Sequence, residues 1–196
     1  MKIIGLTGGS GAGKSVVAAE LKKLGAGIVD ADAIYRKLCD ENLDMLLDLQ
    51  KAFGDILTID KKLDRAKLAG IVFSDSNKLK KLNEITIFYI KKASDEKFKA
   101  LKDKGIKIAI YDAPTLFQTG TDSICDGVIG IIADRNIRIE RIIKRDNISE
   151  KAAIARIDAQ PDDKFYYDRC QYIIKNNVSH ETLKNQVKQL WQRLVK

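Results

Sequence analysis

Several residue types on which other protein classes depend are scarce in this 196-residue chain. The single histidine, His180, excludes histidine-rich zinc sites and any obvious Ser-His-Asp constellation. The three cysteines are scattered without the spacing of metal ligands, which is typical of a reduced, cytoplasmic protein. No segment approaches the ~20 apolar residues that cross a bilayer, and the short apolar start runs directly into glycines, unlike a signal peptide. With only two prolines and no low-complexity tract, the chain offers no interdomain linker, so we expect one cytoplasmic domain without a membrane partner.

The balance of charge is basic, with 35 Lys and Arg against 27 Asp and Glu, a formal net charge of +8. Such an excess favours an anionic ligand, and nucleic acid is one candidate. The lysines, however, are spread along the chain and interleaved with acids, and they form no dense basic tail. This distribution is typical of solvated helix faces, so we expect no nucleic-acid partner.

Apolar segments that favour β-strands alternate with helical patterns along the chain. Strands are expected at Lys2–Thr7, Gly27–Val29, Ile106–Tyr111, Gly127–Ile132 and Tyr172–Ile174. Helical patterns include 33–53, a segment capped by Asp64 that runs through 73, and the basic amphipathic stretch 76–104. Because apolar strands that alternate with helices form parallel sheets covered on both faces, the sequence predicts a three-layer α/β fold. We expect a single domain over residues 1–196, with a helical insertion at about 33–104 and a lid at about 135–170.

The glycine-rich loop that follows the first strand is the most informative segment. Gly8-Gly9-Ser10-Gly11-Ala12-Gly13-Lys14-Ser15 satisfies G-x-x-x-x-G-K-[ST], the phosphate-loop motif of P-loop NTPases. Glycines let backbone N–H groups turn inward around phosphate oxygens, and the helix that follows points its positive end at the same anion. An ordinary glycine-rich turn that binds nothing is the alternative, but four glycines with Lys-Ser in register disfavour it.

The loop assigns roles to its residues. Lys14 is expected to contact the β- and γ-phosphates of ATP and to act in catalysis, and the Ser15 hydroxyl is expected to ligate Mg²⁺. The predicted ATP-binding residues of this segment are Gly8, Gly9, Gly11, Ala12, Gly13, Lys14, Ser15 and Val16.

Three aspartates follow strands, at the sheet edge where ligands of α/β proteins bind. Asp30 and Asp32 come directly after the second strand, and a kinase needs a carboxylate that accepts the proton of the attacking hydroxyl. We predict that Asp32 is this base; the alternative is that it only caps the helix starting near Ala33. Asp112 follows the third strand, either as a carboxylate near Mg²⁺ or as a turn residue before Pro114.

Arginine is concentrated in one part of the chain, since six of the nine lie between Arg135 and Arg169. Arg138, Arg141 and Arg145 fall on one narrow arc of a predicted helix. Guanidinium groups suit the spread negative charge of a transferring phosphoryl group, so this helix is predicted to belong to a phosphate-contacting lid. Seven acidic residues in the same span leave ion pairing as the alternative.

With these segments placed, the chain resembles the dephospho-coenzyme A kinases over nearly its full length. The matching segments are Gly5–Ser15, Asp30–Arg36, Leu63–Arg65, Leu68-Ala69, Val72-Phe73, Leu82-Asn83, Pro114 with Leu116-Phe117, Arg141 with Arg145-Asp146, Arg156–Gln160 and Tyr172–Asn176. The resemblance implies transfer of the γ-phosphate of Mg-ATP to the ribose 3′-hydroxyl of dephospho-coenzyme A, with Asp32 as base. It further implies an acceptor site that includes Asp32, Arg65, Asn83 and Pro114, and ATP contacts from Arg141, Arg145 and Asn176.

The chain departs from the pattern of that family at three places. Ile87-Phe88 stands where the family has His-Pro, Gln118 replaces a glutamate, and Cys170-Gln171 replaces Ala-Asp. The first two fall on the presumed acceptor side, so a raised KM for the acceptor is expected rather than a different acceptor.

Three other functions are compatible with a phosphate loop. Another metabolite kinase with the same core is one, although the segments around Asp32 and Arg65 match the dephospho-coenzyme A kinases better. A nucleotide-dependent switch would hydrolyse slowly, and no small acceptor would accelerate it. A nucleic-acid-binding NTPase would show steeply salt-dependent retention on DNA or RNA.

Overall fold

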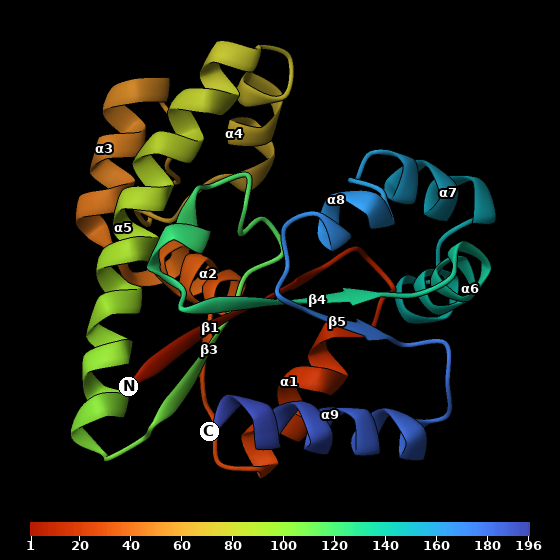
Figure 1. Cartoon of the computed structure of the whole chain (residues 1–196). Helices are drawn as coiled ribbons and strands as arrows, with labels where there is room; N and C mark the ends of the chain where they lie inside the picture. The colour runs from red at the N-terminus through yellow and green to blue at the C-terminus, as the bar shows by residue number, and fades with distance from the viewer. The chain divides into compact units, whose positions relative to one another are not determined.

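A five-stranded sheet forms the centre of the first of two compact units in the computed structural model, which describes residues 1–196 (Figure 1). The first unit comprises residues 1–29 and 101–196, and the second comprises residues 30–100. The strands are β1 (Lys2–Gly8), β2 (Gly27–Asp30), β3 (Ile108–Asp112), β4 (Gly127–Ile132) and β5 (Tyr172–Lys175). Their order is β2-β3-β1-β4-β5, and β1 pairs in parallel with both β3 and β4. The predicted parallel α/β fold is therefore confirmed, and β1 leads into the phosphate loop from the middle of the sheet.

The first unit packs its helices on both faces of the sheet. Apolar residues at alternate strand positions, such as Ile4 and Leu6 of β1, share one buried cluster with residues of α1 (Lys14–Lys23) and α9 (His180–Leu194). On the opposite face α8 (Asp163–Tyr167) lies against β4 (Figure 1). Helices α6 (Arg135–Asp146) and α7 (Glu150–Asp158) join through a small cluster of their own, and a short 3₁₀ turn, η1, covers Thr121–Ile124. None of the helices combines the length and the apolar character that a membrane span requires.

The second unit is helical. It contains α2 (Ala31–Glu41), α3 (Leu43–Phe53), α4 (Arg65–Val72) and most of α5 (Ser76–Asp103). Asp64 caps α4 as predicted, because its side chain accepts a hydrogen bond of 2.9 Å from the Lys67 amide. The helical patterns expected over about 33–53 form two helices, because Asn42 adopts an extended backbone and its side chain accepts from the Met45 amide to start α3.

Candidate active site

The phosphate loop has a backbone that only glycine fits at two of its positions. Gly11 and Gly13 have φ values of +78° and +96°, in the left-handed region. A Cβ on Gly11 would lie 2.6 Å from the Arg138 carbonyl oxygen, and one on Gly13 would lie 2.1 Å from Asn176 Nδ2. Glycine is therefore required at both positions, because the backbone turns there and because Arg138 and Asn176 lie too close for a Cβ.

The first turn of α1 offers unpaired backbone donors. The amides of Gly13, Lys14 and Ser15 donate no hydrogen bond within the chain, as is usual for the start of a helix. Gly13 provides no side-chain cap, and no acidic residue stands in this turn to compete for the positive end of the helix. Ser15 and Val16 are exposed. The arrangement can bind an anion, as the motif predicts.

Lys14 is paired with Asp112 at the base of the loop. Asp112 ends β3, stands beside Leu6 of β1 in the register of the sheet, and is 7% exposed. The Lys14 ammonium donates a hydrogen bond to Asp112 Oδ1 and forms an ion pair with it. The structure thus brings together the loop lysine and the strand-end carboxylate, which are 98 residues apart in the sequence.

Of the four arginines on α6, Arg138 and Arg141 donate to the phosphate loop. Arg138 Nε donates to the Ser10 carbonyl at 2.9 Å, and Arg141 donates to the carbonyls of Gly11 at 3.3 Å and Asn176 at 3.0 Å. Asn176, which is 4% exposed, donates through Nδ2 to the Ala12 carbonyl at 2.8 Å. These side chains hold the loop itself.

Arg145 has a different environment from the other two arginines. It donates two hydrogen bonds to the Asp146 carboxylate, which also accepts from Arg156. The Arg145 hydrogen bond is the main reason why the pKa of Asp146 falls from 3.8 to about 2, and Arg156 lowers that pKa further. The ion pairing weighed as an alternative for the arginine arc therefore describes Arg145, whereas Arg138 and Arg141 contact the loop.

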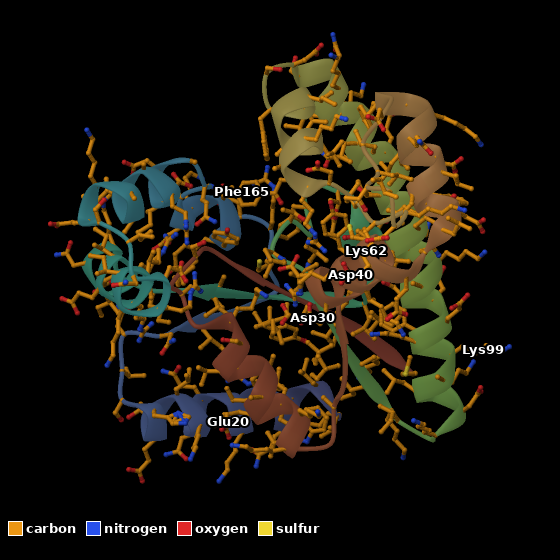
Figure 2. The ribbon with its side chains drawn as sticks, turned by 180° about the vertical axis from the view of Figure 1, so that it is seen from behind. Glu20, Asp30, Asp40, Lys62, Lys99 and Phe165 are labelled. Carbon is orange, nitrogen blue, oxygen red and sulfur yellow. The ribbon has the colours of Figure 1, made fainter.

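Asp30, at the end of β2, and Asp32, in the first turn of α2, have different environments. Asp30, which is labelled in Figure 2, is the N-cap of α2. Its side chain accepts a hydrogen bond of 2.8 Å from the Ala33 amide. The interpretation of Asp32 as the cap is thus wrong: it stands in the first turn of α2, is exposed, and forms neither a hydrogen bond nor an ion pair. A carboxylate without a structural partner is available for chemistry.

The remaining predicted acceptor residues lie on the surface or in a turn. In the second unit, Arg65 opens α4 and pairs with Asp40 of α2 at 2.9 Å, and Asn83 is exposed on α5. In the first unit, the Pro114 carbonyl accepts a hydrogen bond of 3.0 Å from the Thr7 hydroxyl. Pro114 thereby ties the segment after β3 to β1.

Two site residues were missed by sequence reasoning: Gln160 and, as a loop contact, Arg138. Gln160 Oε1 accepts from the Ser10 amide at 2.8 Å and from Arg138 at 3.1 Å. Signals for both existed in the sequence, since Arg138 shares the arc of Arg141 and Gln160 ends a segment with a family match. The departure at Gln171 is structural, because its side chain accepts from the Val128 amide at 2.7 Å.

The chain is similar to known proteins over nearly its full length. A family model described as dephospho-CoA kinase matches residues 2–182. A dephospho-CoA kinase of Syntrophotalea carbinolica is 36% identical over 196 residues, covering 100% of this chain and 93% of that protein. Two solved structures are similar: one from Thermus thermophilus with a TM-score of 0.84 and 29% identity, and a dephospho-CoA kinase from Campylobacter jejuni with a TM-score of 0.72 and 28% identity. They cover 98% and 99% of this chain, and the chain covers 97% and 98% of theirs.

Proposed function

The chain belongs to the dephospho-CoA kinase family, and from that premise we propose which of its residues carry the reaction. The reaction is the phosphorylation of dephospho-CoA to give CoA, with ATP as the phosphate donor. The observation that carries the assignment of the nucleotide site is the set of unpaired amides at Gly13, Lys14 and Ser15, beside the Lys14 ammonium.

The phosphate loop binds the triphosphate of ATP. Backbone amides of the loop and of the first turn of α1 donate to phosphate oxygens, and Lys14 contributes a point charge to the β- and γ-phosphates. The Asp112 carboxylate supports Lys14 by holding its ammonium at the base of the loop. Catalysis by such a site is mainly electrostatic, because negative charge on the transferring group meets donors that the fold has already oriented.

Mg²⁺ fits the residues at the same place. A hydroxyl from Ser15 and a carboxylate from Asp112 are hard oxygen ligands, and magnesium in kinases takes one or two protein ligands beside phosphate oxygens and water. Ser15 and Asp112 would hold the ion, and its charge would offset the negative charge of the phosphates. No group of three or more His, Cys, Asp or Glu residues forms a separate metal cage in the structure.

Asp32 acts as the general base. The ribose 3′-hydroxyl of dephospho-CoA gives its proton to the Asp32 carboxylate as the new oxygen–phosphorus bond forms, and the bond from the γ-phosphorus to the bridging oxygen breaks to release ADP. The exposed, unpaired Asp32 carboxylate supports this role, since nothing in the chain competes for it.

The other predicted contacts are assigned to the two substrates. Arg141 still has its Nε–H and further terminal N–H groups beyond those that bind carbonyls, so it can donate to ATP phosphates as well. Arg145 is proposed to contact ATP from the lid, and Asn176 from the end of β5. Arg65, Asn83 and Pro114 are proposed as acceptor contacts. The three free cysteines support a reducing, cytoplasmic setting for the enzyme.

An acceptor panel tests the proposal. Dephospho-CoA, AMP, CMP, adenosine and pantothenate are each offered with Mg-ATP, ADP release is followed, and the new phosphate is located by NMR. We expect dephospho-CoA to be preferred and its phosphate to lie on the ribose 3′-oxygen. Preference for another compound, or phosphate on another oxygen, would contradict the proposed acceptor and leave the nucleotide site untouched.

A further inference from the structure

Three consecutive carbonyls of the phosphate loop are held by side chains from the last third of the chain. The carbonyls of Ser10, Gly11 and Ala12 accept from Arg138, Arg141 and Asn176 respectively. In a peptide unit the C=O and the N–H point in opposite directions, so a donor that fixes the carbonyl also fixes where the next amide points. The amides oriented in this way are those of Gly11, Ala12 and Gly13. The Ala12 amide donates to the Gly9 carbonyl at 3.1 Å, which leaves the Gly11 and Gly13 amides for phosphate.

The tip of the loop is held most completely. Ser10 uses three of its atoms: its carbonyl accepts from Arg138, its amide donates to Gln160 Oε1, and its hydroxyl accepts from Gln160 Nε2 at 3.1 Å. Arg138 donates to the same Gln160 oxygen and closes the network. We call Ser10, Arg138 and Gln160 the loop clamp.

The clamp is too buried and too specific to be incidental. The Arg138 residue is 6% exposed, and burial lowers the pKa of its guanidinium. Gly9 leaves room for it, since a Cβ there would lie 2.4 Å from an Arg138 terminal nitrogen. Burying a charged group is costly unless hydrogen bonds compensate, and the acceptors here are a loop carbonyl and the Gln160 amide oxygen.

We propose that Arg138 and Gln160 are positioning residues that hold the phosphate loop in its ATP-binding conformation. The proposal rests on the proposed role of the loop in binding ATP. Preorganisation removes the cost of ordering the loop when ATP binds, so loss of the clamp weakens ATP affinity rather than acceptor affinity. Gln160 follows α7 and Arg138 belongs to α6, so the two helices influence nucleotide affinity through Ser10.

The test compares variants of Gln160, which contacts the phosphate loop, with a variant that weakens only the contact between α6 and α7. Gln160→Ala removes both hydrogen bonds to Ser10, whereas Gln160→Glu keeps the acceptor for the Ser10 amide and for Arg138. Arg135→Ala is the matched control, because Arg135 joins α6 to α7 through Asp158 without contacting the loop. Calorimetry measures the Kd for ATP, steady-state kinetics gives the KM for dephospho-CoA, and amide hydrogen exchange reports on the Ser10 N–H.

We expect Gln160→Ala, which removes two hydrogen bonds with Ser10 and one from Arg138, to raise the Kd for ATP by about tenfold. Its Ser10 amide should exchange faster, and its KM for dephospho-CoA should stay unchanged. Gln160→Glu should recover most of the ATP affinity, and Arg135→Ala should match the wild type. If Gln160→Ala does not fold, Arg138→Lys decides, since lysine keeps the charge but replaces the two separate nitrogens that reach Ser10 and Gln160 by a single one.

Two outcomes overturn the clamp. One is wild-type ATP affinity in folded Gln160→Ala protein; the other is an equal loss in Arg135→Ala, which would assign the effect to packing of α6 on α7. Failure of the wild-type enzyme itself to bind ATP in the same titration would instead contradict the proposed nucleotide site.

Discussion

The ATP-side residues and the acceptor-side residues differ in how the fold holds them. Around the phosphate loop, Lys14 and Asn176 contact partners 98 and 164 residues away in the sequence. In the second unit, Asp32 and Asn83 are exposed, and Arg65 has only an exposed neighbour, Asp40, as its partner. One set is fixed through long-range contacts and the other mainly by its own helices.

This difference determines whether folding or substrate binding meets the entropic cost of ordering a side chain. Ordering a long side chain costs roughly 1–2 kcal/mol, and around the phosphate loop folding has already met that cost. For an exposed side chain such as Arg65, substrate binding must meet it. We therefore expect substitutions near the loop to affect the chemical step and nucleotide affinity, and those in the second unit to affect the acceptor with little loss of stability.

Lys14→Ala is expected to produce the largest effect. Removing a charge that meets the transferring phosphoryl group should lower kcat by at least about 10⁴-fold. Circular dichroism and thermal unfolding should show a folded protein. Lys22→Ala, an exposed lysine on the same helix, is the control and should turn over normally. Near-normal kcat in folded Lys14→Ala protein would contradict the role of the phosphate loop in the chemical step.

Asp32→Asn tests the chemical role of an exposed residue in the second unit. Asparagine keeps the shape but cannot take a proton, so kcat should fall by about 10³-fold while the KM for ATP stays similar. The matched variant is Asp30→Ala, which removes the cap of α2 and should cost about 1 kcal/mol of stability with a smaller effect on kcat. If Asp32→Asn loses stability and retains kcat, the base lies elsewhere.

Arg141→Ala and Arg145→Ala sharpen the comparison within one helix. Both are proposed to act on ATP, but only Arg141 contacts the loop. We expect kcat/KM for ATP to fall by about 10²–10³-fold in Arg141→Ala and by less in Arg145→Ala. Steady-state kinetics at saturating dephospho-CoA measures both. An unchanged kcat/KM in both variants would mean that Arg141 only donates to carbonyl oxygens of the chain and that Arg145 only forms an ion pair.

Arg65→Ala should act on the acceptor alone. Loss of a charged contact to dephospho-CoA should raise its KM by about tenfold and leave the KM for ATP as it is. The Arg65–Asp40 pair is exposed, so its loss should cost less than about 1 kcal/mol in stability. Asp40→Asn keeps the guanidinium and serves as the control. A KM that rises equally for both substrates would contradict separate binding sides.

The smallest effect concerns acid stability at the outer end of α6. In the folded protein the pKa of Asp146 is about 2, below its ordinary value of 3.8, chiefly because Arg145 donates to it. The ionised pair therefore stabilises the fold above pH ~4, and that contribution is lost as the pH falls toward ~2. Asp146→Asn should flatten the dependence of Tm on pH in this window relative to the wild type. An unchanged slope in this variant would show that the pair does not stabilise the lid.

The sequence predicted the fold and the ATP-side motif better than the details of packing. Strand β4 lies where the apolar run Gly127–Ile132 predicted it, and Asp64 caps its helix. The sequence did not locate the division between α2 and α3 at Asn42, because one long helix and two shorter helices leave a similar apolar periodicity. The sequence also left open whether Asp32 caps the helix, because either Asp30 or Asp32 can do so, and only the observed start of α2 shows that Asp30 is the cap.

What the sequence by itself determined is the chemistry that local order creates. A strand, a glycine-rich turn and Lys14-Ser15 at a helix start suffice to predict a phosphate site, because the required groups lie within one short segment. What only the tertiary structure decided is which distant side chains hold that segment. Gln160 reaches Ser10 across 150 residues, and Arg138 and Arg145 diverge although they share one helical arc. Hydrogen bonds depend on distances of a few ångströms between chain segments, and no pattern along the sequence fixes those distances.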